Sequence, residues 1–409
     1  MRAPDPTPNR PLFVAVVTET FPPEVNGVAR TIGTMVDALR GRGHRIELVR
    51  PRQGRSDAPS NAPRFEEVLK RGMPIPSYRE LRLGLPAKRA LLARWRGQRP
   101  DVVHVVTEGP LGWSAVGAAR QLGVPVASDF HTNFHTYSRH YGFGQFAGVV
   151  AGYLRALHNR ADCTMVPTSE LKAELEAAGF RRLEVVGRGI DRGVFAPDRR
   201  DERVRAGWGC RGDEPVALYV GRLAPEKGLA LFVEAALAAR VANPALRVVL
   251  VGDGPDAATL RRRHPEFVFA GMRFCEDLAA HYASGDLFVF PSTTETFGNV
   301  TTEALASGLA VVAFDYAAAR QYIRHGQSGL LAKPGDRDAF VAHTQLLAAD
   351  AVLRSRLRAE AALVGAGLSW PRVIDDLEAV FRHLIARRQA GDRAGSATFL
   401  RAEGDRAPS

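Results

Sequence analysis

Residues 287–314 read Leu287-Phe-Val-Phe-Pro-Ser-Thr-Thr-Glu295-Thr-Phe-Gly-Asn-Val-Thr-Thr-Glu303-Ala-Leu-Ala-Ser-Gly-Leu-Ala-Val-Val-Ala-Phe314. The runs 287–290 and 310–314 at its two ends are short and apolar, and the segment between them is long enough for a helix. A strand, a helix and a second strand in this order are typical of a βαβ unit in a parallel sheet. The stretch predicts an open α/β sheet, whose ligands lie beyond the carboxyl ends of its strands.

Short apolar runs alternate with helix-period segments along most of the 409-residue chain, and the pattern occurs twice. In the first half we expect strands at 12–17, 45–49, 102–106 and 124–128 and a helix at 28–40. In the second half we expect strands at 216–220, 247–251, 287–290 and 310–314 and a helix at 229–241. The sequence predicts an α/β protein with two Rossmann-like, doubly wound domains and a cleft between them.

A polar stretch marked by Gly and Pro separates the two halves. We place the first domain at 1–195, a linker at 196–214 and the second domain at 215–369. A helix at 370–388 is expected to pack back toward the first domain. The tail 389–409 is rich in Gly, Ala and charged residues, and is predicted to be disordered.

The composition is that of an ordinary globular protein, with 45% hydrophobic residues. Cys163, Cys210 and Cys275 are far apart and match no zinc or haem spacing, which predicts neither a disulfide framework nor a metal site. The first residues carry Pro and charge where a signal peptide needs an apolar core, and no apolar run approaches the ~18 residues of a membrane span. We expect a cytoplasmic protein whose contact with the inner face of the membrane, if any, is peripheral.

The net charge of +11 lies entirely in the first half of the chain, and residues 51–100 carry much of it. There, arginines and lysines alternate with leucines and Trp95. Two interpretations stay open: a basic amphipathic surface attracted to anionic lipid, or a solvated helix face rich in arginine. Nucleic-acid binding is disfavoured because no recognition motif accompanies the charge.

Glu295 and Glu303 are the first candidate site residues. Glu295 falls on the loop after the strand 287–290, and Glu303 falls within the first turns of the helix that Gly298 and Asn299 open. Eight residues apart on one helix, the two carboxylates would point about 80° apart; with one on the loop, they can converge. A Gly-Asn helix start also presents backbone N–H groups and the positive end of a helix dipole, which suit a phosphate.

Four further candidates follow other predicted strands. Arg222 and Lys227 lie between the strand 216–220 and the next helix, so both can reach one anionic group. Gly27 stands at a helix start, where a diphosphate or sugar can approach the backbone. His131 follows the strand 124–128 and faces the same crevice. A plain turn or a structural histidine is the competing interpretation at each position.

A last candidate, Asp253, lies in the turn that follows the strand 247–251, where a nucleoside would be expected. The sequence contains no Gly-x-Gly-x-x-Gly fingerprint after the first strand and no Gly-x4-Gly-Lys-Ser/Thr loop. These absences disfavour dehydrogenases and P-loop NTPases.

Taken together, the strings from Val14 to about Arg388 resemble the GT-B retaining glycosyltransferases of family 4. The second-domain strings are Gly-Arg-Leu-x-x-Glu-Lys-Gly, Val-Gly-Asp-Gly-Pro and Glu-x7-Glu with Glu-Ala-Leu-Ala-Ser-Gly. Those of the first domain, Thr-Glu-Thr-Phe-Pro-Pro-Glu-Val-Asn-Gly-Val and Phe-His-Thr-Asn-Phe, are similar to bacterial GDP-mannose-dependent α-mannosyltransferases and to sulfoquinovosyltransferases.

The resemblance implies a role for each candidate. Arg222 and Lys227 would bind the donor diphosphate, and Gly27 would border it. Glu295 would contact sugar hydroxyls near the reacting carbon, and His131 would contact the donor sugar. Glu303 would hold the ribose. Gly298 and Asn299 are expected to offer N–H groups to a phosphate, and Asp253 to lie near the nucleoside. Where many relatives read Asn-Gly-Val-Asp, this chain has Arg188-Gly-Ile-Asp, and the role of that arginine stays open.

The resemblance also implies a retaining hexosyltransferase with a sugar nucleotide as co-substrate and no obligatory metal or other cofactor. GDP-mannose is favoured as donor, a UDP-sugar is the alternative, and the acceptor is a glycan or a lipid-linked molecule. Two further alternatives are another GT-B enzyme, such as an epimerase or phosphorylase, and a non-catalytic protein that binds sugar nucleotides. The intact candidate residues disfavour a non-catalytic role.

Overall fold

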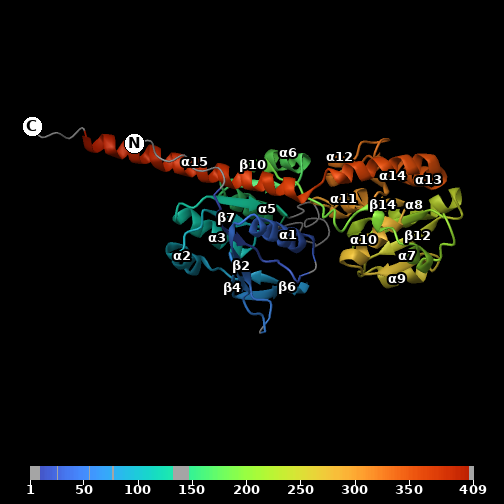
Figure 1. The fold of residues 1–409 in the computed structure, drawn as a ribbon, viewed down its shortest axis with the longest axis horizontal. Helices are drawn as coiled ribbons and strands as arrows, with labels where there is room; N and C mark the ends of the chain where they lie inside the picture. Colours follow the sequence, from blue (N-terminus) through green and yellow to red (C-terminus); the bar gives the residue numbers. More distant parts are fainter. Residues whose placement is uncertain (1–9, 25, 55, 76–77, 132–146, 405–409) are drawn as a thin grey trace, which may run out of the picture.

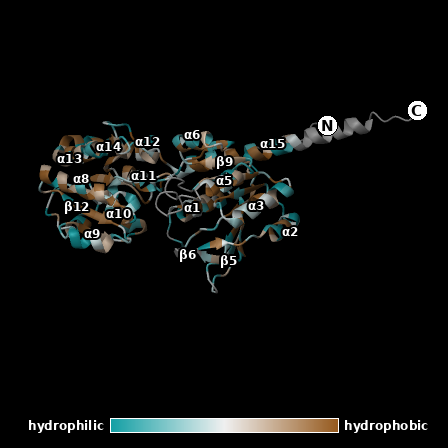
Figure 2. Ribbon diagram, turned by 180° about the vertical axis from the view of Figure 1, so that it is seen from behind, coloured by the Kyte–Doolittle hydropathy of each residue, from teal (hydrophilic) through white to brown (hydrophobic). Residues whose placement is uncertain are grey.

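The computed structural model describes residues 10–24, 26–54, 56–75, 78–131 and 147–404, which form two α/β units, each built on its own sheet (Figure 1). The predicted fold class is confirmed. The predicted strands at 216–220, 247–251, 287–290 and 310–314 have the same bounds in the structure, and those of the first half differ by one or two residues at an end. Figure 2 shows hydrophobic residues on the strands inside each unit, as expected for parallel strands covered by helices.

The first-domain sheet has the strand order β10-β9-β8-β7-β1-β2-β4-β3, with every pair parallel except β3 and β4. A separate antiparallel hairpin, β5 and β6, lies outside it. The strands are β1 (Phe13–Val17), β2 (Arg45–Pro51), β3 (Asn61–Ala62), β4 (Phe65–Lys70), β5 (Gly72–Ile75), β6 (Tyr78–Gly84), β7 (Val102–Val105), β8 (Val126–Asp129), β9 (Cys163–Val166) and β10 (Leu183–Val185). The helices are α1 (Gly27–Gly41), α2 (Lys88–Gly97), α3 (Pro110–Gln121), α5 (Ala147–His158) and α6 (Ser169–Ala177).

The second-domain sheet is entirely parallel, in the order β13-β12-β11-β14-β15-β16. Its strands are β11 (Val216–Val220), β12 (Arg247–Val251), β13 (Val268–Gly271), β14 (Leu287–Phe290), β15 (Ala310–Phe314) and β16 (Gly329–Ala332). Its helices are α7 (Glu202–Gly207), α8 (Leu229–Ala242), α9 (Ala257–Arg263), α10 (Cys275–Ser284), α11 (Asn299–Ala306), α12 (Ala317–Tyr322), α13 (Arg337–Ala349) and α14 (Ala351–Ala366), with 3₁₀ turns η1 (Pro197–Arg199) and η2 (Pro225–Lys227).

The segment 196–214, expected as a linker, contains η1 and α7 and packs on the second domain. The buried Arg205 side chain anchors it: Nη1 donates to the Ser284 carbonyl at 3.0 Å and to Asp286 Oδ2 at 3.1 Å. A buried guanidinium with several acceptors explains why a polar stretch folds here.

The last helix, α15 (Trp370–Gly404), follows the second domain but buries its apolar face in the first. Val373, Leu377 and Phe381 belong to the same buried cluster as Val14 and Ile32. The chain thus crosses between the domains twice. Among the residues that the structure describes, no helix has the length and apolar character needed to cross a membrane.

The sequence predicts a disordered tail at 389–409. In the structure, residues 389–404 are the last part of helix α15 (Figure 1). Alanine, arginine, glutamine and leucine within this stretch all have high helix propensity. A helix already nucleated at 370 also extends without a new nucleation cost.

Candidate active site

A cavity of about 610 Å³ lies between the two domains, where loops at the carboxyl ends of both sheets meet. The first domain contributes the loops after β1, β7, β8 and β10, and the second domain those after β11 and β14. Each sheet reverses its strand order here, between β1 and β7 and between β11 and β14. Open α/β sheets bind ligands at such switch points. Six of the predicted site residues line the cavity: Gly27, His131, Lys227, Glu295, Gly298 and Asn299.

An ion pair between Lys227 and Glu295 lies on the second-domain wall of this cavity. Lys227 Nζ is 2.6 Å from Glu295 Oε1, and the same oxygen accepts a hydrogen bond of 2.7 Å from Ser292 Oγ. Both side chains keep about a fifth of their surface exposed, at 21% and 17%. The pair therefore presents one cation and one carboxylate to whatever occupies the cavity.

The backbone holds Lys227 tightly against β14. Gly228, the next residue, has φ +72°, in the left-handed region that favours glycine. A Cβ at this position would lie 2.7 Å from the carbonyl oxygen of Pro291, so no larger residue fits without a shift. The close approach of the two loops is what places Lys227 beside Glu295.

Two helix N-termini face each other across the cavity. Gly27 begins α1 and Asn299 begins α11, and a Cβ on Gly27 would lie only 3.5 Å from Asn299 Nδ2. No side chain caps α11, whose N-cap is Gly298 at φ +96°. The start of α1 is capped, because Asn26 Oδ1 accepts from the Ala29 N–H at 2.8 Å. The uncapped N–H groups of α11 and the two positive dipole ends make this an anion-binding geometry.

His131 lies on the first-domain wall within a buried charged network. Its Nε2 is 3.3 Å from Asp129 Oδ2, and its Nδ1 is 3.4 Å from Arg188 Nη2. Asp129 also lies 3.1 Å from His104 Nε2. Burial opposes ionisation of Asp129, but the close contacts with His104 and His131 and the charge of Arg188 outweigh it and hold the pKa of Asp129 well below its usual range. The ring of His131 is therefore oriented by protein groups on both sides.

Glu303 is buried and does not line the cavity in this structure. Its Oε2 accepts a hydrogen bond of 2.9 Å from the Tyr282 hydroxyl, and its Oε1 pairs with Arg30 of the first domain. Burial raises the pKa of Glu303, and Arg30 acts in the opposite direction. The ion pair joins α1 to α11 across the domains.

Two predicted residues lie away from the cavity lining. The Arg222 side chain is 49% exposed, with Nη1 3.8 Å from Glu226 Oε1. Asp253 is exposed, and its Oδ1 accepts from the backbone N–H of Gly254 at 2.8 Å. Both follow strands β11 and β12 at the same sheet edge as Glu295, but neither is brought into contact with it.

Sequence reasoning missed three residues of this region: Arg30, Asp129 and Glu19. Arg30 follows Gly27 by one helical turn, a spacing that places both on one side of α1. Asp129 ends β8 two residues before His131. Glu19 follows β1, and its carboxylate accepts from the N–H groups of Gly109 and Leu111 at the start of α3. Burial, only partly offset by these bonds, raises the pKa of Glu19 to about 7.

Comparison with known proteins shows similarity over most of the chain. Residues 25–193 match the family model described as Glycosyltransferase Family 4, and residues 214–350 match Glycosyl transferases group 1. A GDP-mannose-dependent alpha-mannosyltransferase of Mycobacterium tuberculosis is 36% identical, covering 92% of this chain and 97% of its own. A sulfoquinovosyl transferase of Arabidopsis thaliana is 29% identical, covering 84% and 68%. The structure of sucrose-phosphate synthase from Thermosynechococcus elongatus superposes with a TM-score of 0.75 at 20% identity, covering 92% of this chain and 100% of that chain.

Two doubly wound domains with an anion-binding cleft at their switch points define the class of GT-B glycosyltransferases, enzymes that transfer a hexosyl group from a sugar nucleotide. Within that class, the chain belongs to glycosyltransferase family 4.

Proposed function

We propose that the protein transfers mannose from GDP-mannose to a glycan or lipid-linked acceptor, with retention of the anomeric configuration. One observation supports this type of reaction: the Lys227–Glu295 pair lies in the cavity beside two converging helix N-termini. The choice of mannose and of GDP is supported by the relative at 36% identity, which acts on GDP-mannose and aligns over nearly its whole length.

In the proposed reaction, the bond between the anomeric carbon and the diphosphate oxygen breaks, and negative charge grows on the leaving diphosphate. Lys227 and the N-termini of α1 and α11 stabilise that charge more in the transition state than in the ground state. The acceptor oxygen attacks from the same face, and its proton passes to the departing phosphate oxygen. Glu295 orients the sugar hydroxyls and is not the nucleophile.

The remaining predicted contacts fit the same donor pose. Arg222, at the end of β11 and 49% exposed, would turn toward the diphosphate beside Lys227. Asp253, at the end of β12, stands on the nucleoside side. Ribose binding to Glu303 requires the displacement of Arg30, because the ion pair now occupies that carboxylate. His131, held by Asp129 and Arg188, presents its ring to the sugar.

Metal independence is part of the proposal. The negative charge on the leaving diphosphate is balanced by cationic side chains and helix dipoles. These groups provide the charge stabilisation that a divalent ion provides in other transferases. Transfer measured in excess EDTA should match transfer with added magnesium within about twofold. A loss of activity in EDTA that magnesium restores would refute this part.

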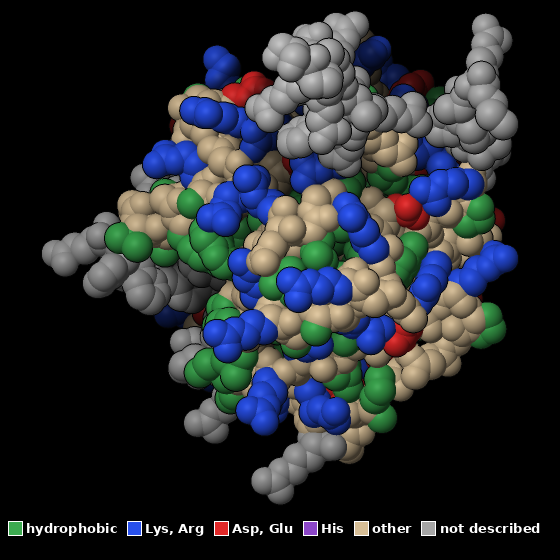
Figure 3. Space-filling model, turned by 90° about the vertical axis from the view of Figure 1, so that its left-hand side faces the viewer, with side chains coloured by type: hydrophobic (Ala, Val, Ile, Leu, Met, Phe, Trp, Pro, Cys, Tyr) green, Lys and Arg blue, Asp and Glu red, His purple; other side chains and the backbone are tan. Residues whose placement is uncertain are grey.

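We further propose that the protein is cytoplasmic and that its basic end attracts an anionic membrane surface. Figure 3 shows Lys and Arg side chains gathered at the end of the molecule that carries α2 and α3. Exposed members of this set are Lys88, Arg89, Arg96, Arg99 and Arg120. On α2 the apolar half of the pattern is not available to lipid, because Leu91 and Trp95 are fully buried, whereas Leu85 before the helix is 36% exposed.

Contact with lipid at this end would therefore be electrostatic and not insertion. Binding to vesicles containing phosphatidylserine should fall steeply when salt rises from 0.05 M to 0.5 M, and should be absent with neutral vesicles. Equal binding to both vesicle types would refute the proposed electrostatic attraction to an anionic membrane.

The donor assignment is tested by thermal stabilisation. A ligand that binds only the folded state raises its melting temperature. GDP-mannose and GDP should stabilise the purified protein more than UDP-glucose and UDP, and transfer to an acceptor should yield the α-anomer by NMR. Stabilisation by the UDP series alone would favour the alternative donor. Donor binding without transfer to any acceptor would favour a non-catalytic protein.

A further inference from the structure

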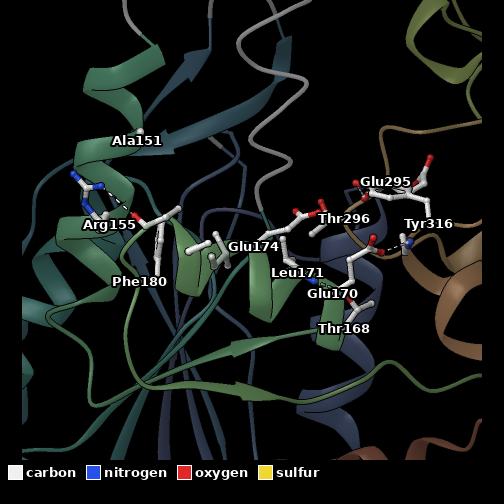
Figure 4. A pocket seen from close by; sticks show the side chains of 14 residues that line it. Ala151, Arg155, Thr168, Glu170, Leu171, Glu174, Phe180, Glu295, Thr296 and Tyr316 are labelled. Carbon is white, nitrogen blue, oxygen red and sulfur yellow. Dashed lines mark hydrogen bonds between the residues drawn. The ribbon is translucent and has the colours of Figure 1, made fainter. Parts of the chain in front are cut away.

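A second cavity of about 420 Å³ lies beside the first, between helices α5 and α6 of the first domain and the loops after β14 and β15 of the second (Figure 4). Glu295 and Thr296 line both cavities. A molecule in the second cavity therefore ends next to the carboxylate that faces the transferred sugar. Nothing in the donor contacts described above uses this space.

The polar groups of this cavity are largely engaged with the protein. Glu170 accepts a hydrogen bond of 3.1 Å from the Ala317 N–H and pairs with Arg320. Arg155 Nη1 donates to the carbonyl of Ala178 at 3.1 Å. The Tyr316 hydroxyl donates to the Glu295 carbonyl at 2.9 Å. A polar ligand would compete with these bonds, whereas an apolar one would leave them intact.

Apart from Thr168, Glu174, Glu295 and Thr296, the rest of the wall is apolar. In Figure 4, Ala151 and Phe180 lie toward the α5 side, Glu174 and Leu171 lie in the centre, and Glu295 lies at the far end. Leu175 and Phe180 are buried in a small hydrophobic cluster of the first domain. The adjacent turn of α5 exposes Val149 by 68% and Val150 by 38%, which is unusual for large apolar side chains on a soluble domain. Apolar surface thus continues from the cavity to the outside of α5.

We propose that this cavity binds the single alkyl, acyl or prenyl chain of an amphiphilic acceptor, whose hydroxyl-bearing head passes Glu295 and Thr296 to reach the sugar. The inference rests on the proposed transfer function and narrows its acceptor from a glycan or lipid-linked molecule to an amphiphile. The volume falls within the ~300–1,000 Å³ of pockets that bind small molecules. Burial of the acceptor's hydrocarbon chain, and not recognition of a second sugar, then selects the acceptor.

Two cavity-filling variants and one matched control test the proposal. Ala151→Trp on α5 and Ala177→Trp at the end of α6 each place an indole in the cavity from a different helix. Ala156→Trp makes the same change on the exposed surface of α5, at a residue that does not line the cavity. Each variant must show the wild-type thermal shift with GDP, which reports an intact donor site.

The first readout is binding of a fluorescent fatty acid, 11-(dansylamino)undecanoic acid, and its displacement by primary alcohols from hexanol to dodecanol. Each added methylene should tighten displacement by about three- to fourfold until the cavity is full. Both cavity variants should weaken probe binding at least tenfold, and Ala156→Trp should not. Equal binding by all four proteins, or no dependence on chain length, overturns the proposal.

The second readout is transfer from GDP-mannose to methyl and dodecyl glucosides. The wild type and Ala156→Trp should prefer the dodecyl acceptor by more than tenfold in kcat/KM, and the two cavity variants should lose that preference. Transfer without chain preference in the wild type overturns the amphiphile assignment. Absence of transfer from every donor, despite normal probe binding, instead refutes the proposed function and leaves the chain-binding cavity supported.

Discussion

At the scale of single residues, the site is a set of charges whose neighbours determine what each can do. Lys227 and Glu295 hold one another in the cavity, and Ser292 completes the carboxylate contacts. Glu303 is already bound to Arg30, so it contacts ribose only after an exchange of partners. Identical residue types therefore carry different roles: one glutamate is exposed to the cavity, and the other is buried beside Tyr282.

Replacing Lys227 by Ala should lower kcat and kcat/KM by about 100- to 1,000-fold, because the lost interaction is strongest when charge develops on the leaving diphosphate. The melting temperature should change little, since the lysine is part-exposed. Steady-state transfer kinetics provide the measurement. Lys88→Ala, on the exposed start of α2, is the control and should retain activity. Near-normal turnover in Lys227→Ala would remove the lysine from the mechanism.

Glu19 predicts a pH dependence of stability. Its pKa in the folded protein is about 7, above the ordinary value of 4.5, so the folded state binds more protons than the unfolded state between these values. Stability from this group is present below about pH 4.5 and is lost as pH rises through 7, by an amount on the order of 3 kcal/mol. Urea unfolding of Glu19→Gln against pH should lack this loss. An identical pH profile in the two proteins would contradict the shift.

At the scale of elements, helix starts and tight loops create the anion site. The N-termini of α1 and α11 come from different domains, and each follows a strand that ends at a switch point. The loop that carries Lys227 passes so close to Pro291 that a glycine is required between them. The ends of the strands fix the positions of the loops, and the loops fix the positions of the charged side chains.

Gly228→Ala should destabilise the protein by about 2 kcal/mol or more, through the positive φ and the contact with the Pro291 carbonyl. Gly326→Ala is the control, because Gly326 has a similar φ of +77° but nothing within 4 Å of a built Cβ. Gly326→Ala should lower the free energy of unfolding by only about 1 kcal/mol. Free energies of unfolding from urea titrations compare the two. Equal losses would show that the contact with Pro291 is unimportant.

At the scale of the whole molecule, contacts between the domains involve residues of the proposed donor site. Arg30 reaches Glu303, Thr296 Oγ1 donates to the His131 carbonyl at 3.1 Å, and Glu170 binds α12. These bonds join the two sides of the cleft close to where the substrates are proposed to bind. If Glu303 binds the ribose as proposed, sugar nucleotide binding and domain contact are coupled through this residue.

Arg30→Met should bind GDP several-fold more tightly than the wild type, because the ribose no longer competes with a cation for Glu303. Isothermal titration with GDP at pH 8 measures the change, and keeping the pH high counters the raised pKa of that carboxylate. Arg30→Lys should stay near the wild-type affinity. Weaker binding by Arg30→Met would instead place Arg30 in contact with the nucleotide.

Much of the fold was predictable from the sequence, because strand and helix periodicity is a local property. The strands at 216–220, 287–290 and 310–314, the start of α11 at Asn299 and the loop position of Glu295 all follow from patterns within a few residues. Those local patterns, with the family motifs, also identified Gly27, His131 and Lys227, which line one cavity. Their catalytic roles stay predictions.

The tertiary structure alone decided which groups pair across the cleft. Arg30 and Glu303 are 273 residues apart, and Glu170 and Arg320 are 150 apart, so no local pattern relates them. The cavity beside Glu295 and the pairing of Glu303 with Arg30 depend on how the two domains approach one another. The burial that shifts the pKa of Glu19 depends on how the loop after β1 packs on the start of α3. The sequence determined the elements and the chemistry at their ends, because those are set by neighbouring residues; desolvation and partner choice are set by residues far along the chain.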